Sequence, residues 1–303
     1  MNVFRQTALA SRPAATRRRP VNSERLWQLA PRWLGRLAFH GLLLLVGLVA
    51  LFPIVWLLTG SLQTIRELYD SVHFLPAVPQ WNNYVQAWEK GNLHTYLPNS
   101  LLYSTIVVLA ILVASSMAGY ALARMDFPGR GAVLVLLLAI LIVPLPASFI
   151  AIYKLLVGVG LANTRAGYIA VLAAGGLPVS IFIMRGFFLR QPRELEEAAA
   201  LDGCSAFDTF WRVMLPLARP GLAAVAIIQF LAAWNEYLLA LVTFNTEALM
   251  PVQRGLTKFV SSDTPEQHIL LAATALAVLP VVILYAFMQR SIVQGIMEGA
   301  VKN

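Results

Sequence analysis

The chain has 303 residues, of which 58% are hydrophobic and only 13% are charged. Soluble domains carry about 25% charged residues, so this composition excludes an ordinary soluble globular protein. A single cysteine excludes an internal disulfide framework. The formal net charge is +8, and its distribution along the chain is more informative than its sum.

The first 37 residues are rich in Arg and Pro, and residues 17–19 are all Arg. Such a segment cannot bury enough apolar surface to fold by itself. We expect a basic cytoplasmic tail (1–37) that faces lipid head groups rather than nucleic acid. The first apolar run begins near residue 40, too late and too long for a cleaved signal, so we expect it to persist as a first transmembrane helix, 38–64.

Six apolar runs are long enough to cross a bilayer, because about 30 Å of hydrocarbon takes about 20 helical residues. They lie at 40–63, 97–123, 131–153, 166–184, 221–246 and 269–289. Backbone amides in lipid need partners within the same segment, so we expect each run to be helical. The predicted fold class is therefore all-α: a polytopic membrane protein with six transmembrane helices.

The Lys and Arg residues outside these runs divide unevenly, with 17 on one side of the membrane and six on the other. The positive-inside rule places the richer side, with both termini, in the cytoplasm. We therefore expect a multi-pass protein of the cell (inner or plasma) membrane. Residues 65–96 would form an external segment, 97–290 the transmembrane core and 291–303 a cytoplasmic C-terminal tail.

Small and cyclic residues interrupt two of the runs. Pro144 and Pro146 fall inside the third run, and Gly175, Gly176 and Pro178 fall inside the fourth. Breaks of this kind persist in a membrane where neighbouring helices or a wet cavity satisfy the freed backbone groups. For each break alone, a simple kink or close packing is at least as good an interpretation as a binding site. Together they favour a moving bundle around a pathway.

The fifth run contains two adjacent polar residues, Asn235 and Glu236, in the sequence WNEY. A carboxylate near the bilayer centre costs about 2.5 kcal/mol or more, so both side chains should face protein or a water-filled pathway. A structural hydrogen bond between helices and direct contact with a solute are both open interpretations. The two residues are candidates for a translocation path.

A short polar segment, 190–220, lies between the fourth and fifth runs. Three carboxylates suit the first turn of a helix, where the helix dipole favours them: Glu194, Glu196 and Glu197. Gly203 can end that helix in a left-handed conformation. Ser205 and Asp208 then have the pattern of a capping box for a second helix. The segment therefore predicts a helix, a glycine turn and a second helix on the cytoplasmic side.

The second helix carries an apolar stripe at helical spacing, which we expect to hold the hairpin onto the spanning bundle. The stripe comprises Phe207, Phe210, Trp211, Met214 and Leu215. Pro216 and Pro220 close this helix before the fifth run.

Within the same segment, the letters EAA at 197–199 are followed after three residues by Gly203, after nine by Val213, and after one by Leu215 and Pro216. This spacing resembles the EAA loop of ATP-binding-cassette importer permeases, which have Ile where this chain has Val213. Shorter matches resemble the sugar-importer branch, the second permease of maltose-type importers. They are NSL at 99–101, ARMDFPGR at 123–130, GLANT at 160–164, WNEY at 234–237 and GAVK at 299–302.

The resemblance implies a type I importer permease for an oligosaccharide, a disaccharide or a glycerol-phosphate-like solute. Its partners would be a second homologous permease, two cytoplasmic ATPase subunits that bind the ATP, and an extracytoplasmic solute-binding protein. In such importers the loop is a coupling helix, which docks in a cleft of the ATPase and converts its closure into movement of the spans. The residues implied in this coupling are Glu196, Glu197, Ala198, Ala199, Gly203, Val213, Leu215 and Pro216.

The resemblance also implies contacts with partner proteins for two further segments. The outer segment 249–268 would touch the binding protein. The C-terminal tail, with Gly295, Gly299 and Lys302, would enter the ATPase assembly.

The sequence contains no phosphate-binding loop of the Gly-x-x-x-x-Gly-Lys-Ser/Thr type, no His-Glu-x-x-His and no Gly-x-Ser-x-Gly. Its four histidines are scattered. We therefore predict no catalytic, cofactor or metal site in this chain, and an intramembrane enzyme lacks its nucleophile–base pair. The alternative is a stand-alone secondary transporter or channel that uses Glu236, which transport by the purified chain alone would favour.

Overall fold

The computed structural model describes residues 24–70, 74–142, 145–260 and 266–300, and within them every regular element is helical. The helices are α1 (Glu24–Gly60), α2 (Ile65–Asp70), α3 (Asn82–Glu89), α4 (Leu93–Arg124), α5 (Arg130–Ile142), α6 (Leu145–Gly158), α7 (Arg165–Arg190), α8 (Glu194–Leu201), α9 (Ala206–Asp208), α10 (Leu215–Leu217), α11 (Arg219–Trp234), α12 (Leu238–Thr243), α13 (Val252–Leu256) and α14 (Gln267–Ala300). A π-helical turn (Thr209–Met214) and two 3-10 turns (Glu247–Leu249 and Thr257–Phe259) complete the elements. The predicted all-α fold class is confirmed.

The chain divides into two compact units, Met1–Ile54 and Val55–Asn303. The described part of the first unit is the beginning of α1. Between residues 37 and 54, apolar side chains cover all sides of this helix, and residues 42–46 in succession are each more than half exposed. A helix that is apolar all round suits lipid rather than water.

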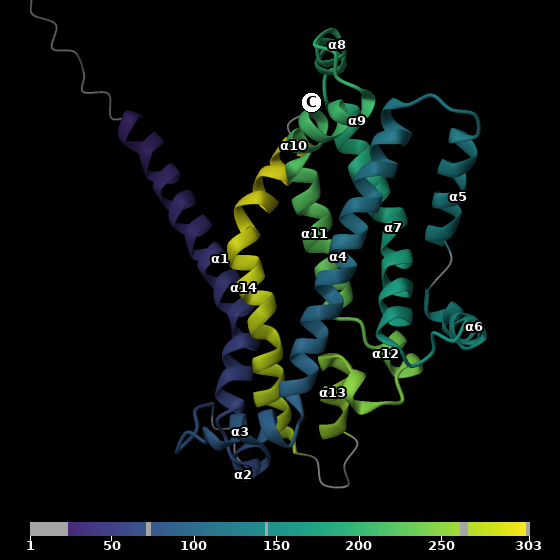
Figure 1. Cartoon of the computed structure of the whole chain (residues 1–303). Helices are drawn as coiled ribbons and strands as arrows, with labels where there is room; N and C mark the ends of the chain where they lie inside the picture. Colours follow the sequence, from purple (N-terminus) through teal and green to yellow (C-terminus); the bar gives the residue numbers. More distant parts are fainter. Residues whose placement is uncertain (1–23, 71–73, 143–144, 261–265, 301–303) are drawn as a thin grey trace, which may run out of the picture. The chain divides into compact units, whose positions relative to one another are not determined.

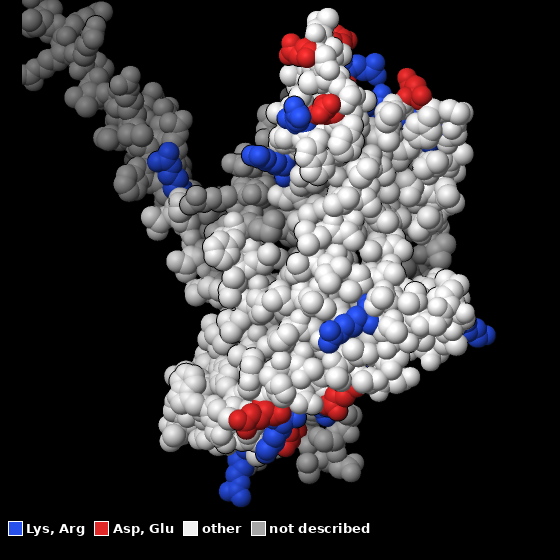
Figure 2. Space-filling model, in the orientation of Figure 1, with Lys and Arg blue, Asp and Glu red and all other residues white. Residues whose placement is uncertain are grey.

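In the second unit, α4, α7 and α11 pack against one another, and α14 packs against α11 and α3 (Figure 1). The short helices α8, α9 and α10 lie at one end of this bundle, and α2, α3 and α13 lie at the other. Figure 2 shows that most charged side chains on the visible face gather at these two ends, with a largely uncharged band between them. Such a band is what a bilayer core requires of the protein surface.

Four helices of the described residues are long and apolar enough to cross a membrane, or up to five if Ala206–Leu217 and Arg219–Trp234, bent by 73°, form one span. The four are α4, α7, the part of α1 from Gly35 to Gly60 and the part of α14 from Gln267 to Phe287. The predicted number of six stays a prediction.

Two of the predicted runs differ from single continuous helices. The third divides into α5 and α6, which are both shorter than a full span. Pro144 lies between them, outside the described residues. The fifth ends at Trp234 and resumes in α12. The fourth run, by contrast, is one unbroken helix, since α7 continues through Gly176 and Pro178.

Glycines in α4 and α7 allow the two helices to approach closely. A Cβ atom at Gly119 would lie 2.8 Å from the Cβ of Met184 and 2.9 Å from the backbone nitrogen of Arg185. A Cβ atom at Gly176 would meet the side chains of Gln229 and Ile111. Lipid gives no hydrophobic driving force for the association of helices. Close packing at small residues stabilises the helix pair instead.

We predict that Gly119→Ala lowers the melting temperature of the detergent-purified protein, because overpacking a tight contact costs about 1–3 kcal/mol. The matched control is Gly131→Ala in α5, where the added methyl group meets no described heavy atom within 4 Å. Alanine is the better helix former, so the control should melt at the same temperature or higher. Equal shifts in the two variants would contradict the close contact.

Candidate functional site

The polar segment after α7 forms a hairpin of two helices around a glycine turn, as predicted. Gly203 has a φ of +84°. Its N–H donates to the carbonyl oxygen of Ala200 at 3.1 Å, and the N–H of Cys204 donates to that of Ala199 at 2.9 Å. These two bonds form a Schellman motif, which ends α8 and turns the chain. The left-handed conformation predicted for Gly203 is confirmed.

Ser205 caps the second helix. Its hydroxyl oxygen accepts a hydrogen bond from the backbone N–H of Asp208 at 3.1 Å and donates to the Asp208 carboxylate at 2.6 Å. The hydroxyl bond favours the charged form and lowers the pKa of Asp208, with a smaller contribution from Arg212. The predicted cap is confirmed, and it fixes the direction in which the chain leaves the turn.

The apolar stripe of the second helix was predicted as one face, and this is wrong. Phe210 and Met214 are buried in the core, whereas Phe207 and Trp211 are 66% and 56% exposed and stack on each other, with ring centroids 6.4 Å apart. The π-helical turn Thr209–Met214 changes the spacing from 3.6 residues per turn, so the stripe divides into two faces. One face anchors the hairpin and the other is presented outward.

Arg124, the last residue of α4, fastens the base of the hairpin. Its side chain, only 6% exposed, donates to the carbonyl oxygens of Phe188, at 2.7 Å, and of Gln191. It also lies 3.7 Å from the carboxylate of Glu196, which is 22% exposed. Arg124 therefore joins the ends of α4 and α7 to α8. Sequence reasoning missed this role, although a cation at a helix C-terminus is a usable signal.

The structure thus separates the residues predicted for coupling. Glu196 faces inward toward Arg124, whereas Glu197 and Ala198 are exposed and Ala199 is buried. The remaining members of the pattern, Val213, Leu215 and Pro216, are half-buried where the second helix meets the bundle.

At the opposite end, two asparagines from the short sequence matches hold the chain after α12. The Asn99 amide donates to the carbonyl oxygens of Ala248 and Met250 at 2.8 and 3.1 Å. Asn163, with a φ of +53°, donates to the hydroxyl of Thr246 at 2.7 Å and accepts its backbone N–H at 3.2 Å. The letters NSL and GLANT therefore contain anchors of one turn at this end of the bundle.

The predicted outer segment 249–268 begins as packed structure. Val252 is buried and its N–H donates to the hydroxyl of Ser100 at 2.8 Å. Gly255 lies so close to Tyr96 that a Cβ atom there would clash with the ring. Residues 261–265 lie outside the described residues.

Glu236 is half-buried between α11 and α12. Its carboxylate accepts the backbone N–H groups of Leu239 and Ala240 at 2.8 and 3.1 Å, and the Tyr168 hydroxyl donates to it at 3.4 Å. It therefore caps the first turn of α12 and explains why the fifth run breaks there. The neighbouring Asn235 is exposed and receives a hydrogen bond from Gln253 at 3.4 Å.

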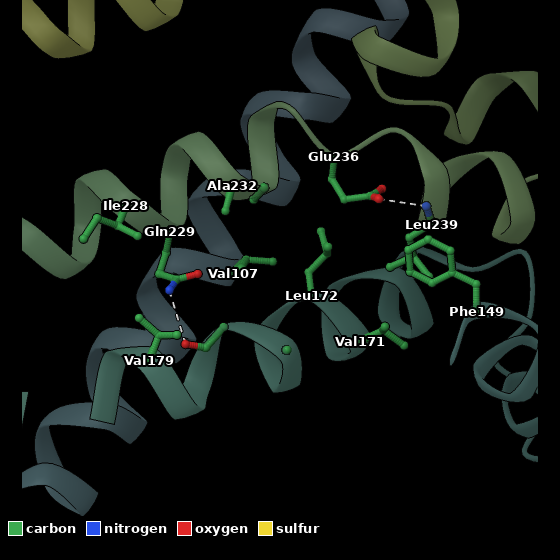
Figure 3. Close-up of a pocket in the computed structure, with 13 residues that line it drawn as sticks. Val107, Phe149, Val171, Leu172, Val179, Ile228, Gln229, Ala232, Glu236 and Leu239 are labelled. Carbon is green, nitrogen blue, oxygen red and sulfur yellow. Dashed lines mark hydrogen bonds between the residues drawn. The ribbon is translucent and has the colours of Figure 1, made fainter. Parts of the chain in front are cut away.

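A pocket of about 320 Å³ lies among α4, α6, α7, α11 and α12. Its lining is mostly aliphatic, with Phe149 from α6 and two polar side chains, Gln229 and Glu236 (Figure 3). Gln229 lies on α11 and Glu236 lies just beyond the end of that helix, and both line the pocket. Sequence reasoning missed Gln229 because an uncharged residue does not interrupt an apolar run.

The C-terminal residues predicted to reach a partner are described only in part. Gly295 and Gly299 lie within α14, and Lys302 lies outside the described residues. Within the part of the chain that the structure describes, no group of three or more His, Cys, Asp or Glu side chains could hold a metal ion.

Comparison with known proteins gives a family and several relatives. Residues 106–298 match the family described as "Binding-protein-dependent transport system inner membrane component". The chain is 33% identical to the diacetylchitobiose uptake system permease protein NgcG of Streptomyces coelicolor, over 86% of this chain and 87% of that protein. It is also 33% identical to the arabinooligosaccharides transport system permease protein AraQ of Bacillus subtilis, over 88% and 96%.

Among solved structures, the fold is similar to a chain of a bacterial ABC transporter involved in the import of the acidic polysaccharide alginate. The TM-score is 0.73 at 24% identity, over 92% of this chain and 99% of that one. A second match is to an alginate ABC transporter in complex with an alginate pentasaccharide-bound periplasmic protein. Its TM-score is 0.60 at 13% identity, over 88% and 96%.

We predict that Arg124→Met loosens the hairpin, because it removes hydrogen bonds from a charged donor that are worth about 1.5–3 kcal/mol. Amide hydrogen exchange across residues 194–216 should become about ten- to a hundredfold faster. The control is Arg130→Met: its 2.8 Å ion pair is with Asp126, a carboxylate that is 96% exposed, and its other bonds go to the carbonyl oxygens of Ala123 and Met125, not to the hairpin. If both variants left exchange in the hairpin unchanged, Arg124 would not be its anchor.

Proposed function

The chain belongs to the family of binding-protein-dependent transport system inner membrane components, and we propose that it works as the permease subunit of an ATP-driven importer of carbohydrate. It is a membrane transport subunit and not an enzyme. The solute class rests on the relatives, whose names include diacetylchitobiose and arabinooligosaccharides.

The observation that carries this proposal is the hairpin at the end of the spanning helices. Its exposed tip presents Leu201, which is 90% exposed, together with the stacked pair Phe207 and Trp211 and the carboxylate of Glu197. An apolar centre bordered by charge is the composition of a protein-binding surface. The occupant proposed here is the cleft of a cytoplasmic ATPase subunit.

The residues of the EAA pattern divide between two tasks in this proposal. Glu197 and Ala198 are exposed and would contact the ATPase. Glu196 would keep the hairpin attached to Arg124, and Gly203 would set the angle between its helices. Ala199, Val213, Leu215 and Pro216 would hold the second helix against the bundle.

The remaining partners follow from the class of importer. They are a second homologous permease, a second ATPase subunit and an extracytoplasmic solute-binding protein, and ATP would be bound by the ATPases rather than by this chain. The matched alginate transporter in complex with a periplasmic protein supports the last of these. The tail 291–303, with Gly295, Gly299 and Lys302, would enter the ATPase assembly, and the segment 249–268 would touch the binding protein.

The proposed topology places both termini in the cytoplasm of a cell-membrane protein. It is supported by the excess of Lys and Arg on the side of the hairpin. The tail 1–37 would then lie inside, 38–64 would span, 65–96 would lie outside, and 97–290 would form the transmembrane core, with the hairpin segment 190–220 inside.

Asn235 and Glu236 are proposed to border the translocation path. The alternative, a stand-alone transporter driven by an ion gradient, would need Glu236 to bind and release a cation or proton. Its carboxylate instead holds two backbone N–H groups of α12, a structural use that favours the importer. In proteoliposomes, the purified chain alone should give no uptake, and uptake should require the ATPases, the binding protein and ATP. Gradient-driven uptake by the chain alone would contradict the proposal.

We predict that Gly203→Val uncouples the importer: ATP hydrolysis continues while solute uptake falls about five- to thirtyfold. The left-handed conformation costs most side chains about 1–2 kcal/mol, which lowers the population of the native turn about five- to thirtyfold. No described atom lies within 4 Å of the new Cβ position, so the effect is conformational and not a clash.

The control is Gly203→Asn, because asparagine tolerates the left-handed region and should keep most of the coupling. Membrane insertion should be normal in both variants. Equal uptake by the Val and Asn variants would show that the turn does not govern coupling.

A further inference from the structure

The short helix α3, at the opposite end of the bundle from the hairpin, lies beside a spanning helix and not beyond its end (Figure 1). Ala87 of α3 is fully buried in one apolar cluster with Ile269 and Ala273 of α14. The spanning part of α14 begins at Gln267, so Ala273 lies only about 9 Å along it, at 1.5 Å per residue. These contacts place α3 at the depth where the hydrocarbon of a bilayer begins.

The end of α1 fixes α3 at the same level. At Gly60, the last residue of α1, an added Cβ atom would lie 2.9 Å from Cδ1 of Leu271 in α14. Directly after α1, the buried Asn83 of α3 donates from Nδ2 to the carbonyl oxygens of Ser61 and Gln63, both at 2.9 Å. This carboxamide fastens α3 to the point where the first apolar helix ends.

The connection from α2 to α3 is tied to the same place. Thr64 and Glu67 form a capping box for α2: the Thr64 N–H donates to the Glu67 carboxylate at 2.8 Å, and the Glu67 N–H donates to the Thr64 hydroxyl at 3.3 Å. The other carboxylate oxygen of Glu67 accepts the N–H of Ala77 at 3.0 Å. The carbonyl oxygen of Leu62 accepts the N–H of Gln80 at 2.9 Å. Residues 74–80 therefore follow a fixed path into α3.

Two sides of α3 are distinguished by their burial. Asn83 and Ala87, one turn apart, are buried against the bundle. Trp81, Val85 and Trp88 are spaced by four and three residues, so they share another face of the helix, and they are between 45% and 68% exposed. This second face is apolar and turned away from the bundle.

A third side of α3 is polar. Asn82, Gln86 and Glu89 have the same spacing of four and three residues, and Asn82 and Glu89 are exposed. The helix therefore has one side on protein, one apolar side and one polar side. An adjoining apolar and polar side is the arrangement of a helix that lies in the plane of a membrane surface.

Lipid is the occupant that this depth and composition indicate for the apolar side. Tryptophan is enriched at the boundary between hydrocarbon and water, because its ring is large and apolar while its N–H needs a polar partner. A binding protein that docks and leaves would return the three apolar side chains to water after each departure, whereas lipid covers them at all times.

We propose that α3 is an interfacial anchor, which lies in the bilayer surface on the side opposite the hairpin. Trp81, Val85 and Trp88 contact phospholipid at the boundary between headgroups and acyl chains, and the polar side is directed to water. The anchor fixes the depth of α14 and of the end of α1 in the membrane. It requires only that α14 spans the bilayer, so it is independent of the solute and of the ATPase.

The test measures the depth of residue 85 with a fluorescent label. Val85→Cys carries nitrobenzoxadiazole in a chain whose own cysteine is changed by Cys204→Ser, and the protein is reconstituted with its partner subunits in phospholipid vesicles. Nitroxide lipids labelled at the headgroup, near the glycerol or at the chain end should together give a depth of about 5–10 Å below the headgroups. Iodide, present on both sides of the vesicles, should quench this label only weakly.

The matched control is Glu89→Cys, which carries the same label on the polar side of the same helix. Iodide should quench this label strongly. Equal quenching by iodide at positions 85 and 89 would overturn the anchor. Protection of position 85 from both iodide and nitroxide lipids would also overturn it, because a partner subunit and not lipid would then cover the apolar side.

A second measurement needs no label and leaves Cys204 in place. Brominated phospholipid should quench a smaller fraction of the tryptophan emission in the double variant Trp81→Phe, Trp88→Phe than in wild type. The control is Trp234→Phe, which removes a buried ring and should raise the quenched fraction instead. An unchanged or larger quenched fraction in the double variant would overturn the anchor.

Discussion

The close contact between α4 and α7 is the constraint on which both functional regions depend. Lipid supplies no hydrophobic drive to bring helices together, so the contact relies on small residues and shape. Gly119 admits Met184 and the backbone beside it, and Gly176 admits the side chain of Gln229 from α11. Five residues beyond Gly119, Arg124 reaches the end of α7 and ties it to the hairpin.

The same two helices therefore connect the hairpin to the pocket. Arg124 binds the carbonyl oxygen of Phe188 at one point of α7, and Gln229 binds that of Gly176 three turns away. A force applied to the hairpin would act first on the ends of α4 and α7. Farther along their length, the same two helices line the pocket. Glu236 extends this arrangement by capping α12 at the pocket's edge. The hairpin and the pocket are therefore both attached to α4 and α7, although they have no residue in common.

Local chemistry explains which parts of this arrangement the sequence predicts. The helical class, the glycine turn and the Ser205 cap depend on neighbours along the chain, and all three are confirmed. The divided face of Phe207 and Phe210 was not predictable, because a π-helical turn leaves no mark in a pattern of 3.6 residues. Arg124 and Gln229 act on groups more than 50 residues away, so only the fold reveals their partners. Of the interpretations that the sequence left open at Gly176, the structure shows close packing within a continuous helix.

The measurement closest to the central claim uses Cys204, the only cysteine of the chain, which is partly exposed beside the Gly203 turn. In the proposed topology this residue lies on the cytoplasmic side, against the ATPase. A short bismaleimide should join Cys204 to a cysteine introduced in the ATPase cleft, with a yield that changes when ATP closes the ATPase dimer. A membrane-impermeant maleimide added to intact cells should leave it unlabelled. Labelling of Cys204 from outside the cell would contradict both the topology and the coupling role of the hairpin.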